Sequence, residues 1–214
     1  MQITELALLH LSCDVTVDNV ALRSKLSHAK TVMQKYTGHA FYYMQQIEEP
    51  ALVYIVGEWD SLDQHMDKFI PSADNQALLE SLKGALTVER LEHIDVPHAD
   101  LPLPKREAQL EHARQGGLIW SIVRYYIKDG AKQDFLDTLE ANKHYIQGFV
   151  TEGTIGGGWR IDKEDGKEVF VLLSPWKSVE QHLEFGKTDG FQKYAQIRKY
   201  IDGADIKHAK LLDI

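Results

Sequence analysis

The chain has almost no cysteine, no long apolar run and no basic leader. Cys13 is the one cysteine among 214 residues, so no disulfide forms within the chain and a cysteine-based metal site is excluded. No apolar run approaches the roughly 18 residues of a membrane span, and Met1 to Glu5 carry no basic segment of the kind that begins a secretion signal. These absences predict a cytoplasmic protein without a membrane partner.

Positive charge is also scarce. The 24 Lys and Arg residues are outnumbered by 32 Asp and Glu residues, which gives a formal net charge of -8. A phosphate backbone is bound by clustered cations, and neither Lys nor Arg forms such a cluster here. Nucleic acid is therefore not an expected partner.

One segment of the sequence occurs twice. Trp59 to His65 returns as Trp176 to His182, with the shared pattern Trp-x-Ser-x-Asp/Glu-Gln-His. A shortening by two residues after the second copy also aligns His93 with His208. The chain is therefore interpreted as a tandem repeat. A first repeat at residues 1–96, a linker at 97–117 and a second repeat at 118–214 are expected.

Both halves show the same order of patterns, namely strand, helix, strand, strand, helix, strand. In the first half, strands are expected at 4–12, 40–47, 51–59 and 86–96, and helices at 19–35 and 61–83, the latter interrupted near Pro71. In the second half, strands are expected at 118–127, 149–161, 168–175 and 204–214, and helices at 131–147 and 178–201, the latter broken. This is the ferredoxin-like layout twice.

The segment between the halves is rich in proline. Three of the six prolines lie within 97–104, and proline fixes φ and removes a hydrogen-bond donor. An extended tether is expected here, with a short helix at 107–114.

In the first strand of each half, apolar residues occupy both the odd and the even positions, which face opposite sides of a sheet. Leu6 to Leu11 and Ile119 to Val123 are examples. Such strands are typical of sheets that are covered on both faces. We predict an α+β fold in which two ferredoxin-like βαββαβ repeats pack sheet to sheet as an intramolecular dimeric α+β barrel. A cavity is expected between the sheets.

With this layout and its two Trp-x-Ser-x-x-x-His junctions, the chain resembles the dimeric α+β barrel superfamily. Within it, the chain is most similar to the antibiotic-biosynthesis-monooxygenase-like domains, in a fused two-copy form. Members include cofactor-free oxygenases acting on polycyclic phenols, polyketide cyclases, haem-handling enzymes and proteins without a known activity. The resemblance implies a small aromatic or polyketide-like ligand and direct reaction of oxygen with a substrate anion.

Two departures from family patterns argue against a cyclase and against a haem-degrading enzyme. Olivetolic-acid-cyclase-like members carry His-Pro-x-His, whereas Ile70-Pro71-Ser72-Ala73 keeps only the proline. Haem-degrading members use a histidine later in the same helix, and neither 75–83 nor 191–199 contains one. The expected enzyme therefore needs no bound cofactor.

The histidines are the candidate catalytic residues. The Ser and Gln of the repeated motif form a capping box, which alone would explain the motif as a helix start with its Trp in the core. In the functional interpretation, His65 and His182 lie near the positive end of a helix dipole, which disfavours imidazolium and leaves a base for a phenol or enol. His93 and His208 lie on partly apolar strand faces, either as satisfied core residues or as part of the same site.

Most of the aromatic residues are expected to fill the core or the space between the sheets, and a few could line a pocket for a flat ligand. Five residues are candidates for substrate binding: Trp59, Tyr54, Arg124, Trp176 and Trp120. Arg124 is a cation in an otherwise apolar strand, and such a charge is rarely buried without a partner. A substrate carboxylate or phenolate, or Glu58, is the expected partner. Gly156 to Gly158 opens no helix, so it is interpreted as a bulge or bent strand and not as a phosphate loop.

The leading hypothesis is a cofactor-independent monooxygenase-like enzyme that modifies a small phenolic or polyketide-type molecule in a barrel cavity, with histidine as general base. One alternative is a cofactor-free cyclase or isomerase, for which the same histidines suffice. Another is a non-catalytic, stress-related barrel that binds a small molecule, and a haem-binding protein is a further one. No metal ligand set is expected, and a homodimer is compatible with the sequence.

Overall fold

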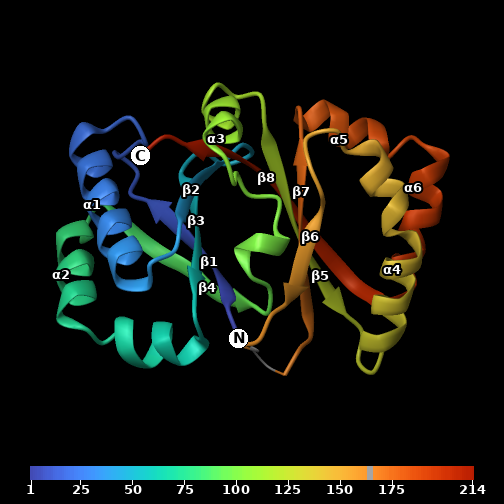
Figure 1. Cartoon of the computed structure of the whole chain (residues 1–214), viewed down its shortest axis with the longest axis horizontal. Helices are drawn as coiled ribbons and strands as arrows, with labels where there is room; N and C mark the ends of the chain where they lie inside the picture. The colour runs from blue at the N-terminus through green and yellow to red at the C-terminus, as the bar shows by residue number, and fades with distance from the viewer. Residues whose placement is uncertain (163–165) are drawn as a thin grey trace. The chain divides into compact units, whose positions relative to one another are not determined.

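The computed structural model describes residues 1–162 and 166–214 (Figure 1). The chain divides into two compact units. Unit 1 comprises Met1–His98 with Leu211–Ile214, and unit 2 comprises Ala99–Lys210. Both units have strands and helices in the expected order, so the fold class is α+β. The packing of one sheet on the other stays a prediction.

Unit 1 contains a four-stranded antiparallel sheet with helices on one face. Its elements are β1 (Ile3–Leu11), α1 (Val20–Thr37), β2 (Phe41–Gln46), β3 (Leu52–Trp59), the π-helical turn η1 (Gln64–Phe69), α2 (Ala73–Leu82) and β4 (Leu86–Ile94). The strand order is β4-β1-β3-β2. Helices α1 and α2 lie on the same side of this sheet (Figure 1).

Local sequence signals set the helix limits in unit 1. The Asn19 side chain accepts a hydrogen bond from the Leu22 N–H and caps α1, and Gly38 ends that helix at a φ of 77°. The expected interruption near Pro71 is confirmed, because Pro71 lies between η1 and α2 and the Ser72 hydroxyl caps the new helix. This break keeps η1 short, directly after the end of β3.

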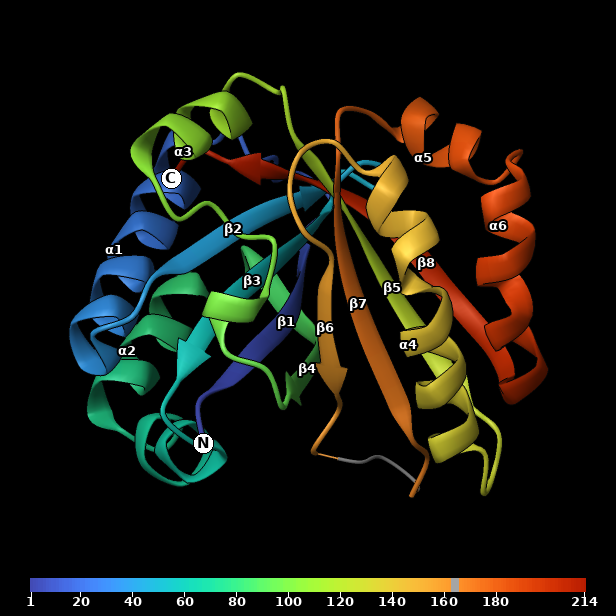
Figure 2. The same ribbon diagram turned by 45° about the vertical axis from the view of Figure 1, so that its right-hand side comes forward.

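Unit 2 repeats this layout. Its elements are α3 (Glu107–Arg114), β5 (Ile119–Ile127), α4 (Lys132–Phe149), β6 (Gly156–Trp159), β7 (Val169–Trp176), α5 (Val179–Phe185), α6 (Asp189–Tyr194), the 3-10 turn η3 (Ala195–Tyr200) and β8 (Ile201–Leu212). The strand order is β8-β5-β7-β6. Helix α4 packs against α6 and η3 on one side of the sheet (Figure 2).

The strand expected at 149–161 is wrong in its first part. Phe149 is the last residue of α4, where its ring packs 5.5 Å from that of Phe185, and the strand begins only at Gly156. Of the two interpretations of Gly156 to Gly158, the bulge is wrong and the hairpin strand agrees with the structure, since Gly156 to Trp159 pair in register with β7. A Cβ on Gly156 would lie 2.0 Å from the Asp100 carbonyl oxygen, so glycine allows close backbone approach here.

The proline-rich segment is packed and is not a free tether. Leu101 and Leu103 are buried, and the Trp120 indole N–H donates to the Pro102 carbonyl at 2.6 Å. The 3-10 turn η2 (His98–Asp100) precedes these residues, and α3 forms where a short helix was expected. The segment therefore supplies buried side chains to the core of unit 2.

The last four residues belong to unit 1. Leu212 and Ile214 pack on the core cluster formed by residues such as Leu22 and Leu26. The Arg23 guanidinium donates to the Asp213 carbonyl, and Lys30 Nζ donates to the Ile214 carbonyl at 2.7 Å. In the described part of the chain, no helix has the length and apolar character needed to cross a membrane.

Candidate functional site

The repeated motif begins a helix in both units, as the capping interpretation predicted. The Ser61 hydroxyl accepts from the Gln64 N–H at 3.1 Å, and the Gln64 side-chain oxygen accepts from the Asp60 N–H at 2.8 Å. In unit 2, Ser178 and Gln181 make the same pair of contacts, the second with the Lys177 N–H. The Gln therefore binds the residue before the Ser, and the cap fixes where the next side chain, a histidine, points.

In each unit the motif histidine is hydrogen-bonded to the histidine of the last strand. His65 Nδ1 lies 2.7 Å from His93 Nε2, and His182 Nδ1 lies 2.8 Å from His208 Nε2. We call these the first and the second histidine pair. An N···N hydrogen bond needs one donor and one acceptor, so at least one ring of each pair is neutral at the shared contact.

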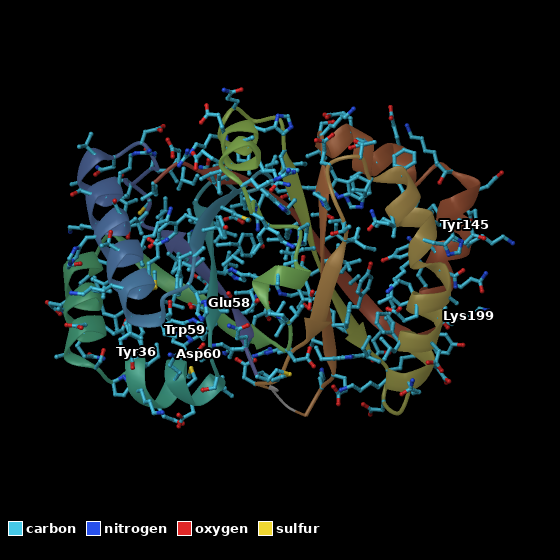
Figure 3. The ribbon with its side chains drawn as sticks, viewed as in Figure 1. Tyr36, Glu58, Trp59, Asp60, Tyr145 and Lys199 are labelled. Carbon is cyan, nitrogen blue, oxygen red and sulfur yellow. The ribbon has the colours of Figure 1, made fainter. Side chains whose placement is uncertain are left out.

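The motif tryptophan stacks on the motif histidine. The rings of Trp59 and His65 lie 4.0 Å apart with an interplanar angle of 9°, and those of Trp176 and His182 lie 4.5 Å apart at 14°. Both tryptophans are fully buried. Trp59 lies at the end of β3, next to Asp60 and near Tyr36, whose ring is 6.2 Å from its own (Figure 3). The stack fixes the plane of the imidazole.

Unit 1 adds a carboxyl group to its histidine pair. Glu5 of β1 lies opposite His93 of β4, and its Oε2 accepts a hydrogen bond of 2.7 Å from the Trp59 indole N–H. The same oxygen lies 3.9 Å from His65 Nε2. Burial, only partly offset by Trp59 and His93, raises the pKa of Glu5 to about 7. The cluster of Glu5, His65, His93 and Trp59 therefore holds a carboxyl that changes protonation near neutral pH.

A cavity of about 220 Å³ lies beside this cluster, between the sheet and the helices of unit 1. Glu5 and His65 both line it, together with apolar side chains of α1, α2 and the sheet, such as Met33 and Leu78. Two lining residues, Leu79 of α2 and Val88 of β4, are 45% and 50% exposed, so the cavity lies close to the surface of the unit. We call this space the unit 1 cavity.

The corresponding position in unit 2 has no carboxyl group. Ser121 of β5 lies opposite His208 of β8, and its hydroxyl accepts from the Trp176 indole N–H at 2.9 Å. Burial and the neighbouring His208 lower the pKa of His182 to about 4. The low pKa of His182 agrees with the neutral imidazole expected from the sequence, but its main cause is burial and not the helix dipole. The cavity beside His182 has only about 100 Å³.

The candidate binding residues divide between the two faces of the sheets. Trp59 and Trp176 contact the histidine pairs, whereas Tyr54 and Trp120 point to the opposite face, since neighbouring strand residues alternate. Tyr54 Oη accepts from the Gln46 side chain at 3.1 Å. Arg124 also lies on the opposite face, where its guanidinium is 3.7 Å from Asp205 of the adjacent strand.

Sequence reasoning missed Glu5. The signal was present, because Glu5 is a charged residue in an otherwise apolar strand, the same feature that singled out Arg124. Among the described residues, no group of three or more His, Cys, Asp or Glu side chains is arranged to hold a metal ion. The histidine pair and Glu5 themselves are groups that transfer protons, and two of the three line a mostly apolar cavity.

The fold and the site together define an α+β protein of two units, each with the ferredoxin-like element order and a hydrogen-bonded histidine pair. No protein-family model matches the sequence, and no curated protein matches it. Solved structures are similar over nearly the whole chain. A Fusobacterium nucleatum protein, provisionally named a monooxygenase, has a TM-score of 0.68 at 10% identity, covering 99% of this chain and 93% of that one.

Two other solved structures are similar to the chain. An anthrone oxidase-like protein has a TM-score of 0.63 at 9% identity, covering 99% of this chain and 92% of that one. The chlorite dismutase of Candidatus Nitrospira defluvii has a TM-score of 0.58 at 10% identity, covering 99% and 91%. At such low identity the likeness shows the fold alone.

Gly57 leaves space for the Phe41 ring, which packs against Trp59. A Cβ at Gly57 would lie 2.2 Å from the Phe41 ring, and Phe41 packs edge-on against Trp59 with a centroid distance of 5.6 Å. We expect Gly57→Ala to lower the free energy of unfolding by about 1–3 kcal/mol, the usual cost of overpacking. Urea denaturation measures this. The double variant with Phe41→Leu should regain part of the loss, and an unchanged midpoint for Gly57→Ala alone would contradict the packing argument.

His98 should make the protein sensitive to acid. Burial and the neighbouring His39 lower the pKa of His98 to about 4, below the ordinary value of 6.5. The folded state therefore binds fewer protons than the unfolded chain between these pH values, so stability falls as the pH drops from 6.5 to 4. We expect His98→Phe to flatten this part of the profile of unfolding free energy against pH. A variant profile as steep as the wild type would show that His98 is not the responsible group.

Proposed function

We propose that the chain is a cofactor-independent monooxygenase-like enzyme, a fused pair of antibiotic-biosynthesis-monooxygenase-like domains that oxidises a small phenol in the unit 1 cavity. His65 is the general base and His93 orients it. One observation carries the proposal: His65 is held through Nδ1 by His93 at 2.7 Å while its ring lines an apolar cavity of about 220 Å³. The proposal involves no nucleic-acid or membrane partner.

The hydrogen bond between the two imidazoles selects the reactive nitrogen. When His65 Nδ1 donates to His93 Nε2, the lone pair of His65 remains on its own Nε2, on the side of Glu5. Stacking on Trp59 holds the ring in that plane. An oriented neutral imidazole of this kind is suited to take the proton of a phenolic hydroxyl.

The size of the cavity limits the substrate. An apolar protein cavity of about 150 Å³ binds benzene, so a space of about 220 Å³ suits a molecule of one or two rings. Apolar side chains such as Leu26, Met33 and Leu82 would contact these rings. The hydroxyl group would lie at the polar end, beside His65.

The reaction balances without a second reductant. His65 takes the phenolic proton, and the electron-rich phenolate passes one electron to O₂, after which the two radicals join at the para carbon. Loss of the hydrogen on that carbon and cleavage of the O–O bond leave a quinone and water. One oxygen atom enters the product, and the other leaves as water with the two hydrogens of the substrate.

Oxygen uptake with 1-naphthol tests the proposal. Formation of 1,4-naphthoquinone with one O₂ consumed for each molecule would support it. A rearranged product without oxygen uptake would replace it with a cyclase or isomerase. Recovery of unchanged 1-naphthol from a protein that binds it would leave a small-molecule-binding protein, and a Soret band after incubation with haem would point to a haem protein.

A further inference from the structure

Resting on the proposed function, we propose that Glu5 is a second catalytic residue of unit 1, the general acid that protonates the departing hydroxide and so releases water from the substrate hydroperoxide. If His65 acted alone as the base for the hydrogen on carbon, hydroxide would have to leave as a free anion in a mostly apolar cavity, which is costly. A second group that donates a proton as the O–O bond breaks removes this cost.

The position of Glu5 fits this role. It lies at the centre of the sheet, paired with Gly57 on one side and with His93 on the other. Its carboxyl oxygen is 3.9 Å from His65 Nε2, and both side chains line the unit 1 cavity. The two groups therefore line the same cavity, and at 3.9 Å one bridging water or a small side-chain movement would let a proton pass between them.

The surroundings keep Glu5 available as an acid. Its titratable neighbours are His65 from η1, His93 from β4 and Tyr43 from β2, while α1 and α2 offer apolar side chains and the neutral Asn75. Among the described residues that line the cavity, none is a lysine or an arginine that would hold the carboxylate ionised. Burial accordingly raises the pKa of Glu5 to about 7.

Each proton transfer in this step is made by His65 or by Glu5. Protonated His65 first returns its proton to the peroxide anion, which gives the neutral hydroperoxide. His65 then removes the hydrogen on the para carbon while the O–O bond breaks, and Glu5 gives its proton to the departing hydroxide, which leaves as water. The proton on His65 finally passes to the Glu5 carboxylate, so both groups regain their starting states.

Unit 2 offers an internal comparison. Its histidine pair and its stacked tryptophan match those of unit 1, but Ser121 stands where Glu5 stands. The Ser121 hydroxyl fills the structural role, because it accepts the Trp176 indole N–H as Glu5 accepts that of Trp59. A serine hydroxyl is no proton donor for a leaving group near neutral pH. We infer that the water-releasing step belongs to unit 1 alone.

The test compares Glu5→Gln and Glu5→Ser with the wild type, using 1-naphthol as the probe. Glutamine retains an oxygen for the Trp59 N–H, and serine copies the arrangement that unit 2 already has. We expect both variants to consume oxygen and to accumulate a hydroperoxide, detected by iodide oxidation. The yield of quinone for each O₂ should fall at least tenfold. Ser121→Ala is the matched control and should keep the wild-type yield.

A pH profile separates catalysis from structure. In the wild type the quinone yield for each O₂ should decline above pH 7 as Glu5 loses its proton, and in Glu5→Gln the yield should stay low at every pH. Wild-type yields in both Glu5 variants would overturn the role of Glu5 and leave the proposed function intact. Absence of oxygen uptake by the wild type would instead overturn the proposed function, and the role of Glu5 with it.

Discussion

The variant His65→Gln is expected to lose about 10²–10⁴-fold in turnover of a phenolic substrate, the range that a general base contributes. Glutamine can still hydrogen-bond to His93, but it cannot take a proton. The double variant with His182→Gln should be equally inactive. Because unit 2 has a smaller cavity and no carboxyl group beside its histidine pair, His182→Gln alone should retain turnover within about twofold.

Initial rates of oxygen uptake measure this prediction. Near-ultraviolet circular dichroism serves as the control, because Trp59 and Trp176 stack on the substituted rings and would report a disturbed core. Unchanged turnover in the double variant would remove both histidines from the mechanism. A loss confined to His182→Gln would move the active site to unit 2.

Glu5→Gln should change how the stability of the protein depends on pH. The pKa of Glu5 is raised from 4.5 to about 7, so the folded state binds this proton more tightly than the unfolded chain does. Stability from this group is full below pH 4.5 and is lost as the pH rises through 7. Between these limits the wild type should lose up to about 3 kcal/mol relative to the variant, at 1.36 kcal/mol for each pKa unit.

Urea midpoints of the two proteins between pH 4.5 and pH 8 provide the measurement. Other titrating groups, His98 and His182 included, are common to both proteins, so the difference between the two profiles isolates Glu5. We expect the variant to be the more stable protein at pH 8, since it has no charge to bury there. Parallel profiles across this range would mean that the Glu5 carboxyl is hydrated in solution.

The repeated motif made much of the fold predictable. Two copies of one helix start, each preceded by strand patterns, indicate the same element order twice. The same alignment paired His93 with His208. The prediction failed at Phe149, because an aromatic residue suits both a helix face and a strand, and a contact with Phe185 decides between them.

The site itself was only partly predictable. The hydrogen bond between His65 and His93 depends on the register of β4 against β1, and the pairing of Glu5 with His93 depends on the same register. Periodicity shows which residues share a face but not which strands are neighbours. The position of the unit 1 cavity, between the sheet and its own helices, depends on side chains from four strands, from α1 and α2 and from η1, whose packing no local pattern encodes.

The return of Leu211–Ile214 to unit 1 has a consequence for synthesis. A ribosome delivers residues 1–98 first, yet the contacts of Arg23 and Lys30 with Asp213 and Ile214 form only after residues 211–214 have been made. Unit 1, which holds Glu5 and His65, therefore completes these contacts only after the residues of unit 2 have been synthesised. A nascent chain stalled before residue 211 would lack the contacts that Arg23 and Lys30 of α1 make with that segment.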